Sequence, residues 1–377
     1  MTAQAVAGGS PLFRIVRWLA PAAQPAIALV IAALVGGLLV AAIGDDPIQV
    51  YGILISGSLV GVPNLMVTLQ IMTPLLFTGL AVSISFRAGL WNIGVEGQML
   101  VGGFFAGLVG WLLPLPAAVH IPLTLIAAMF GGALWSAIPA FLRVKLNVNE
   151  LVVCLMLNPV ALLLTGYFTI HVLKASGPTN KLPDVLDTAM LPQFSLFSQV
   201  NAGIFLALGC CILFAVINAR TVRGFEWKIM GLDPIFAYYG GVDVPRRAIS
   251  AMLVSGAIAG LGGAEEVMGV YRAFFDGFSP GYGFDGIAVA MLANFNPLGV
   301  IASAGLFGAL ESGGVVLQMT TNVSKYLVEV LQFTTVLILA AQFSWGWLRL
   351  WRGAGAETER IGVVAEPAPN PVAAEET

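Results

Sequence analysis

The polar residues with the clearest chemical potential lie in one short stretch, residues 86–98, which reads FRAGLWNIGVEGQ. This stretch lies between two long apolar segments and carries Arg87, Asn92, Glu96 and Gln98. Polar side chains within a bilayer are costly, so they usually face a cavity, a partner or a substrate path. The recurring glycines indicate an interrupted helix or a close contact between helices. The alternative is a cytoplasmic turn with a satisfied ion pair.

The composition is that of a polytopic helical membrane protein. Of the 377 residues, 58% are hydrophobic and 10% are charged, whereas soluble domains carry about 25% charged residues. The net charge of −3 argues against nucleic acid as a partner. The three cysteines lie in apolar runs and the two histidines lie far apart, so no disulfide and no metal site is predicted. Without a Ser/His/Asp grouping, no catalytic residue is predicted and a hydrolase is poorly supported.

Apolar runs that approach the roughly 20 residues a helix needs to cross the bilayer recur along the chain. Residues 50–61 are too few for a span and predict a short helix at the outer surface. Asn294, Asn296 and Pro297 interrupt the region 286–310, which predicts two short or broken elements. The fold class is therefore all-α, a polytopic transmembrane bundle of about ten crossings with broken helices. The predicted spans and apolar regions are 27–43, 65–86, 99–113, 121–142, 151–173, 202–217, 249–270, 286–310 and 326–345.

The distribution of Lys and Arg predicts the orientation of the bundle. Arg14 and Arg17 precede the first span, so the N-terminus is expected in the cytoplasm. Alternation of the spans leaves the connection 174–200 outside and puts most basic residues inside. The residues after 351 are rich in Ala, Glu and Pro, which predicts a disordered cytoplasmic tail at 352–377 behind a transmembrane domain at 1–351. The other basic residues expected inside are Arg143, Lys145, Arg220, Arg223, Lys228, Arg246, Arg247, Arg349, Arg352 and Arg360.

A second informative block, residues 223–247, falls on the cytoplasmic side. Asp233 followed by Pro234 predicts a helix start, and Gly240 is expected to end the helix in a left-handed conformation. A helix of about two turns is not stable alone. Its apolar and aromatic side chains therefore need the membrane surface or a partner protein, unless the segment is an ordinary amphipathic connector.

A third block reads LNVNELVVCLMLN over residues 146–158. Asn149 and Glu150 predict a helix start, and Asn158 lies about two turns further on nearly the same face. An Asn inside a span either joins helices or hydrogen-bonds a solute. Both roles remain open for Asn158.

A fourth block contains two adjacent acids near the outer end of a span, Glu265 and Glu266. Exposure to water, or pairing with Arg272, is the expected explanation for their charges. The following loop, residues 271–284, is rich in aromatic residues and glycine and predicts an interfacial aromatic belt or an extracytoplasmic gate.

Three of these motifs together resemble the membrane permeases of bacterial ABC importers. They are FRAGLWNIGVEGQ, NELVVCLMLN and GLGGAEEVMGVYRAFFDGFSPGYGFDGIAVAMLANFNPLG, and they occur in the expected order between residues 65 and 310. The chain is most similar to the nucleoside-importing branch related to sugar and branched-chain amino-acid permeases. The resemblance implies a type II importer-like fold in the bacterial inner membrane, in contact with membrane lipid.

The resemblance also implies partners for the chain. They are a second, related permease, a cytoplasmic ABC ATPase and an extracytoplasmic lipoprotein that delivers the solute. The chain has no G-x-x-x-x-G-K-[ST] motif, so ATP and Mg are expected on the ATPase and no cofactor is expected on this chain. The short helix at 233–241 matches the coupling helix that docks on the ATPase. The residues implied in this contact are Gly231, Asp233, Pro234, Phe236, Tyr238, Gly240 and Gly241.

The substrate path is implied in the same way. Its amides and carboxylates are expected to hydrogen-bond a base or ribose, with an aromatic ring stacking on the base. Glu265 is an extra acid at a position that is usually apolar in the family, and residues 293–296 replace a more usual glycine-containing stretch. The residues implied in the path are Phe86, Trp91, Asn92, Glu96, Gln98, Asn158 and Glu266.

The expected function is alternating access driven by a separate ATPase, without covalent chemistry on this chain. One alternative is the same importer with a simple sugar as its solute. Another is an ion-coupled secondary transporter in which Glu96 or Glu266 relays protons. A membrane-embedded enzyme is disfavoured because no catalytic set is present.

Overall fold

The computed structural model describes residues 30–42, 44–194, 198–321, 326, 328–330 and 332–334. The basic residues near both termini, the tail after 351 and most of the predicted span 326–345 lie outside the described residues. Within them the regular structure is helical, apart from two isolated β-bridges.

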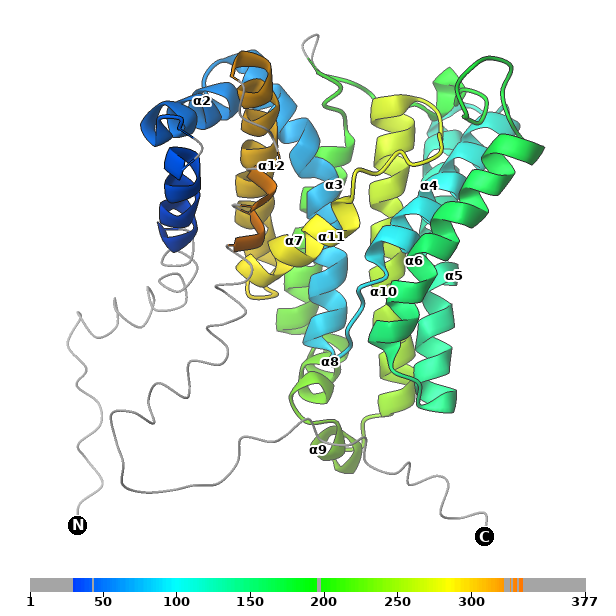
Figure 1. The fold of residues 1–377 in the computed structure, drawn as a ribbon. Coiled ribbons are helices and arrows are strands. Elements are labelled where there is room, and N and C mark those ends of the chain that lie inside the picture. The colour runs from blue at the N-terminus through cyan, green and yellow to red at the C-terminus, as the bar shows by residue number, and fades with distance from the viewer. Residues whose placement is uncertain are drawn as a thin grey trace, which may run out of the picture. The chain divides into compact units, whose positions relative to one another are not determined.

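The helices follow one another through the chain as a bundle (Figure 1). Among the described residues, seven helices are long and apolar enough to cross a membrane: α3, α4, α5, α6 with η1, α7, α10 with η3, and α12. The all-α prediction of a polytopic bundle is therefore confirmed. The helices are Val30–Ala42, α2 Pro47–Leu59, α3 Val62–Arg87, α4 Val95–Leu112, α5 Ala117–Leu146, α6 Glu150–Tyr167, η1 Phe168–Val172, η2 Asp187–Ala189, α7 Gly203–Arg220, α8 Val222–Leu232, α9 Pro234–Tyr239, α10 Val244–Glu265, η3 Glu266–Tyr271, α11 Tyr282–Leu292 and α12 Pro297–Thr320.

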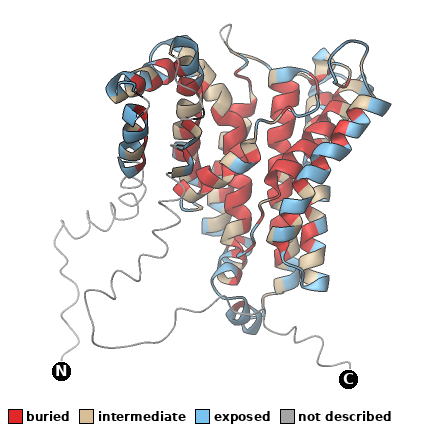
Figure 2. Ribbon diagram, viewed as in Figure 1, coloured by how far each residue is buried: buried red, intermediate tan, exposed pale blue. Residues whose placement is uncertain are grey.

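Helix α10 lies at the centre of the described bundle and packs against α3, α4 and α5. Small residues allow this close approach. A Cβ at Gly260 would lie 2.2 Å from the carbonyl oxygen of Ala128, and a Cβ at Gly263 would lie 2.1 Å from that of Met99. Figure 2 shows the result, with buried residues concentrated in α3, α4 and α10 and exposed residues along the outer sides of α5 and α6.

Helix α11 is a short helix inside the bundle, and it packs against α3 and α12 (Figure 1). Its 11 residues give a length of about 16 Å, which is roughly half of the hydrocarbon core. The chain then turns through residues 293–296, and α12 begins at Pro297 with Asn296 as its N-cap. The predicted interruption at Asn294, Asn296 and Pro297 is therefore confirmed, but the prediction of two short elements is wrong for α12, whose 24 residues are enough to cross a membrane.

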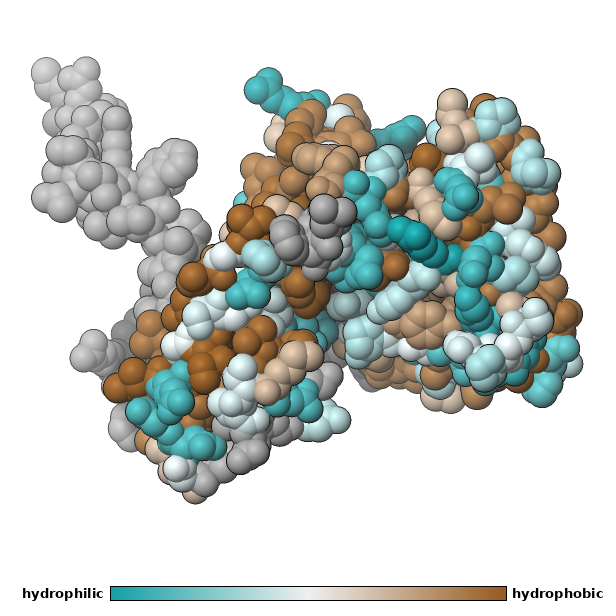
Figure 3. Space-filling view, turned by 90° about the horizontal axis from the view of Figure 1, so that it is seen from above, coloured by the Kyte–Doolittle hydropathy of each residue, from teal (hydrophilic) through white to brown (hydrophobic). Residues whose placement is uncertain are grey.

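The two ends of the bundle differ in charge. Helices α8 and α9 lie at one end, where the basic residues of the α5–α6 and α7–α10 connections also lie (Figure 1). The connection between α6 and α7 lies at the other end and carries Lys174 and Lys181. Figure 3 views this second end, where a band of polar residues crosses between more apolar regions.

Candidate functional site

The stretch that carries the polar motif is a break between two membrane helices, which we call the first break, residues 88–94. Helix α3 ends at Arg87 and α4 begins at Val95. Gly89 has a φ of +76°, a conformation that a residue with a side chain rarely adopts. The predicted span at 99–113 begins too late, because α4 starts four residues earlier. Glu96 and Gln98 therefore lie in the first turns of a helix.

Asn92 organises the first break through five side-chain hydrogen bonds, one of them a weak bond that its Oδ1 accepts from Sγ of Cys154 at 3.6 Å. Its Nδ2 donates to Oε1 of Gln98 at 2.9 Å and to Oγ of Ser255 at 2.8 Å. Its Oδ1 accepts from Nε2 of Gln98 at 2.8 Å and from the backbone N–H of Gly94 at 3.1 Å. Asn92 and Gln98 are both buried. Because an Asn amide has two donor hydrogens and two acceptor positions, Asn92 has no capacity left for a solute in this conformation.

Asn158 joins α6 to both sides of the same break. Its Nδ2 donates to the carbonyl oxygen of Ile93, and its Oδ1 accepts from the N–H of Gly97, each at 3.0 Å. The N–H of Gly97 is one of the first-turn donors that has no partner within its own helix. Of the two roles left open for Asn158, these contacts are those of a residue that joins helices.

Glu96 connects the starts of two helices. Its Oε2 accepts from the N–H of Gly283 at 2.7 Å, in the first turn of α11. A Cβ at Gly283 would lie 2.3 Å from the backbone nitrogen of Glu96, so the two helix starts are in direct contact. A carboxylate is favourable at this position because both helix N-termini carry partial positive charge.

Three aromatic rings connect the first break to the turn before α12. The ring of Phe86 lies 4.9 Å from that of Trp91 and 4.9 Å from that of Phe295, centre to centre. Trp91 is 54% exposed, so its ring is accessible in this chain. Phe86 and Trp91 were predicted for the path, whereas Phe295 was noted only as part of an unusual stretch. The sequence feature that could have indicated Phe295 is its position, as an aromatic residue within the predicted break at 293–296.

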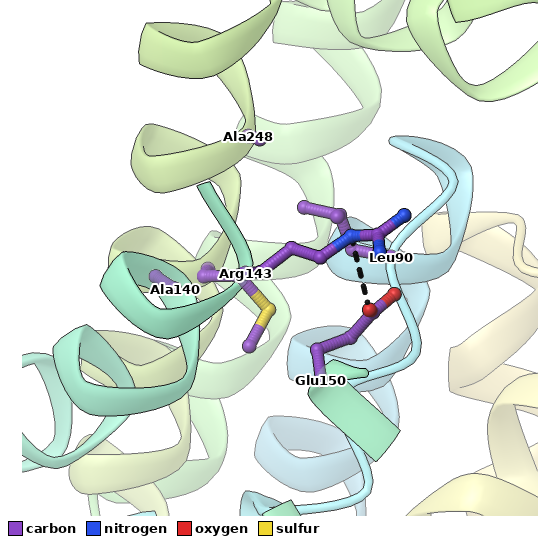
Figure 4. Close-up of a pocket in the computed structure, with 6 residues that line it drawn as sticks. Leu90, Ala140, Arg143, Glu150 and Ala248 are labelled. Carbon is purple, nitrogen blue, oxygen red and sulfur yellow. Dashed lines mark ion pairs between the residues drawn. The ribbon is translucent and has the colours of Figure 1, made fainter. Parts of the chain in front are cut away.

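A second missed contact lies beside the first break. Figure 4 shows Arg143 and Glu150 pointing toward one another at a small cleft lined also by Leu90, Ala140 and Ala248. Nε of Arg143 lies 3.2 Å from Oε2 of Glu150. Oε1 of Glu150 accepts from the backbone N–H of Trp91 at 3.4 Å. The pair therefore ties α5 and α6 to the break.

The two adjacent glutamates differ from their prediction. Glu265 is 1% exposed and Glu266 is 2% exposed, and within the described part of the chain no ion pair joins either to Arg272. Oε1 of Glu265 instead accepts from Nδ2 of Asn201 at 2.7 Å. Arg272 donates to Oε1 of Gln193 at 3.0 Å. The expectation of water exposure or pairing with Arg272 is wrong because the α6–α7 connection covers this end of α10.

The aromatic loop after η3 is also more buried than an interfacial belt would be. Phe274 and Phe278 have 0% and 2% exposure and pack in the protein interior. The carbonyl oxygen of Phe274 accepts from the N–H of Leu182, at 2.8 Å, in the α6–α7 connection. The belt prediction is therefore wrong for these two residues, while the possible role of the loop as a gate stays a prediction.

The short helix α9 forms as its residues indicate. Oδ1 of Asp233 accepts from the N–H groups of Ile235 and Phe236 at 2.9 and 3.0 Å, and Pro234 is the first helical residue. One detail is wrong: Gly240 has a φ of −75°, and Gly241, at +84°, is the left-handed residue. The N–H of Gly240 still donates to the carbonyl oxygen of Phe236 in α9. The left-handed conformation therefore occurs one residue later than predicted, at Gly241.

Helix α9 exposes apolar side chains at the end of the bundle. Four such side chains lie in α9 and a fifth, Leu232, lies at the end of α8. We call this set the α9 surface: Leu232, Ile235, Phe236, Tyr238 and Tyr239, with exposed fractions between 56% and 83%. Ala237, by contrast, is fully buried and holds the helix against the protein. A contiguous exposed apolar group of this kind marks a site of interaction.

The chain matches the family of permease components of branched-chain amino acid transport systems over residues 64–340. It belongs to this family. The chain is therefore a multi-pass membrane permease component and not an enzyme, as its motifs predict. It is 34% identical to a guanosine ABC transporter permease protein of Bacillus subtilis over 324 residues, which cover 85% of this chain and 93% of that protein.

Two further relatives cover similar lengths. A glucose ABC transporter permease protein of Haloferax volcanii is 33% identical over 335 residues, 85% of this chain and 87% of that protein. A nucleoside ABC transporter permease protein of Lactococcus lactis is 31% identical over 341 residues, 85% of this chain and 90% of that protein. The similarity therefore extends well beyond the three motifs.

Proposed function

We propose that this chain is the permease subunit of an ATP-driven importer that moves nucleosides inward by alternating access. The family and the ABC transporter relatives support the importer class. Relatives named for guanosine and for nucleosides favour that solute, and the relative named for glucose keeps a simple sugar as the alternative. The single observation that carries the proposal is the match to the guanosine permease over 85% of this chain and 93% of that protein.

The α9 surface is the proposed docking site for the ATPase. Phe236 and Tyr238 are 64% and 56% exposed on a two-turn helix that needs a partner. The ATPase would bind ATP and Mg²⁺, and its closure would move α8 and α9. The end of the bundle that carries α9 would then be cytoplasmic, in agreement with its basic residues.

The aromatic group formed by Phe86, Trp91 and Phe295 is proposed to contact the nucleobase. Stacking on an aromatic side chain contributes about 1–3 kcal/mol per base. Asn92 and Gln98 would act indirectly, by fixing the backbone that positions Trp91.

The remaining partners are proposed from the family. They are a second, related permease, which would complete the cavity, and an extracytoplasmic lipoprotein, which would deliver the solute. The chain would lie in the inner membrane with both termini in the cytoplasm and lipid around the outer helices. Glu266, the buried first residue of η3, stays a candidate for the extracytoplasmic end of the path.

Uptake of radiolabelled nucleosides tests this function. Cells would carry this chain with its partner subunits and either an active or an inactive ATPase. Saturable uptake that disappears with the inactive ATPase is expected. Uptake that depends only on the proton gradient would contradict the proposal. Uptake of glucose but not of nucleosides would show that the solute is a simple sugar.

The docking site has its own test in the double variant Phe236→Ala/Tyr238→Ala. We expect it to reach the membrane in normal amount but to lose uptake, because both side chains are exposed and contribute little to folding. Failure to insert would contradict a coupling role for this helix.

A further inference from the structure

Two glycines bring α8 into direct backbone contact with the first break. A Cβ at Gly231 would lie 2.1 Å from the carbonyl oxygen of Arg87 and 2.9 Å from the backbone nitrogen of Gly89. Conversely, a Cβ at Gly89 would lie 3.0 Å from the Cα of Gly231. No side chain fits between these two segments, although 142 positions separate them in the sequence.

On one side of this contact, α8 and α9 are firmly joined. The N–H of Asp233 donates to the carbonyl oxygen of Ile229 at the end of α8, at 2.9 Å, while its carboxylate accepts from the first turn of α9. Trp227 of α8 is buried, and its Nε1 donates to Oγ of Ser250 in α10 at 3.2 Å. A displacement of the α9 surface therefore moves the end of α8 that carries Gly231.

On the other side, the first break leads to the bonds around Asn92. Gly89 is three residues from Asn92, which is bonded to Ser255 of α10 and to Gln98 of α4. Asn158 bonds the next residue, Ile93, to α6. A displacement of Gly89 would therefore reach α4, α6 and α10 through the hydrogen bonds of Asn92 and Ile93.

We propose that the contact between Gly231 and Gly89 transfers movement of α8 and α9 to the first break and so sets the position of Trp91 and Asn92 during transport. This inference rests on the proposed ATPase-driven function. Directly packed backbone atoms transmit displacement because protein interiors have low compressibility. Gly231 is a positioning residue in this account and does not contact the solute.

The variant Gly231→Ala tests the contact, because Gly231 has no left-handed backbone conformation and the change adds only a methyl group. Gly209→Ala is the matched control, since Gly209 also lies in a helix and its added Cβ meets no atom within 4 Å. We expect uptake by Gly231→Ala to fall by about tenfold. ATPase binding is measured in parallel, so that a loss of uptake through the ATPase contact, which the resemblance implies for Gly231, is distinguished from a loss through the contact with Arg87 and Gly89. Gly209→Ala should transport like the wild type.

Amide hydrogen exchange of the assembled transporter gives a readout that a purely structural role would not move. Exchange is compared without nucleotide and with a non-hydrolysable ATP analogue and Mg²⁺. In the wild type, peptides that cover residues 222–241 and 88–94 should both respond to the nucleotide. In Gly231→Ala, the response should persist in 222–241 and disappear in 88–94.

The outcomes separate this inference from the function on which it rests. Uptake that needs no ATPase activity in the wild type would overturn the proposed function. ATPase-dependent uptake that is equal in Gly231→Ala and Gly209→Ala would overturn only the inference. If Gly231→Ala does not assemble, the wild-type exchange decides: a nucleotide response in 88–94 supports the transfer, and its absence overturns it.

Discussion

The two breaks in membrane helices are held in different ways. The first break, residues 88–94, has local backbone bonds, such as the one from the N–H of Leu90 to the carbonyl oxygen of Ser85 at 3.0 Å. It is bonded in addition to side chains of α4, α6 and α10. In the second break, residues 293–296, the bonds within the described part of the chain are local only: the N–H groups of Asn294, Phe295 and Asn296 donate to carbonyl groups of α11 and of the turn itself, at 2.8–3.0 Å. Asn294 and Asn296 are exposed, whereas Asn92 is fully buried.

This difference indicates which break can respond to the rest of the protein. A turn that is satisfied by its own neighbours keeps its shape when surrounding helices move. A break that is also bonded to side chains of three other helices follows the movement of those helices. The first break is therefore the one suited to couple helix movement to the proposed substrate path.

Asn92→Ala should have the largest effect. It removes all five hydrogen bonds of the buried amide and leaves Gln98 and Ser255 without that partner. Each buried polar group left unbonded costs about 1–3 kcal/mol. We expect loss of nucleoside uptake together with a lower midpoint of thermal unfolding in detergent. Normal uptake would show that the break does not depend on this network.

Asn158→Ala should have the next largest effect. It leaves the N–H of Gly97 and the carbonyl oxygen of Ile93 without their side-chain partner, at about 1–3 kcal/mol each. If Asn158 joins helices, as its contacts favour, uptake and assembled protein should decrease together. A loss of uptake with full assembly would instead identify Asn158 as a solute contact. Uptake and membrane content are measured on the same preparation.

Glu96 allows charge and hydrogen bonding to be separated. Glu96→Gln retains an oxygen that accepts from the N–H of Gly283, whereas Glu96→Ala removes it. A hydrogen bond to a charged group contributes about 1.5–3 kcal/mol. We therefore expect uptake to fall further in the Ala variant than in the Gln variant. Equal loss in both would mean that the negative charge is required, as a proton-relay role would demand.

The second break should be the most tolerant. Asn296→Ala removes the N-cap bond to Leu298 and should cost about 1 kcal/mol of stability. Asn294→Gly should be neutral or slightly stabilising, because Asn294 has a φ of +50°. Thermal unfolding in detergent measures both changes. An effect of either variant on uptake as large as that of Asn92→Ala would remove the distinction between the two breaks.

Local features were predictable from the sequence. Asp233 and Pro234 begin α9, and Asn296 and Pro297 begin α12, because a cap and a proline act on their immediate neighbours. The long apolar runs likewise predicted the membrane helices. The start of α4 was missed because Asn158, distant in sequence, bonds its first turn.

Features that depend on distant segments were not predictable. Glu265 is buried because Asn201, in a connection that folds back over α10, covers and bonds it. The contact between Gly89 and Gly231 has no local signature either, since each glycine alone is compatible with an ordinary turn or helix. The contact between the rings of Phe295 and Phe86 joins two segments that lie far apart in the sequence, so no local pattern indicates it.

The most direct test of this account is a parallel measurement of ATP-dependent nucleoside uptake in proteoliposomes that contain the complete transporter. Wild type, Asn92→Ala and Asn296→Ala are compared at equal protein content, each with active and inactive ATPase. The account predicts ATPase-dependent uptake by the wild type, nearly equal uptake by Asn296→Ala and none by Asn92→Ala. Uptake by Asn92→Ala equal to that by Asn296→Ala would contradict it.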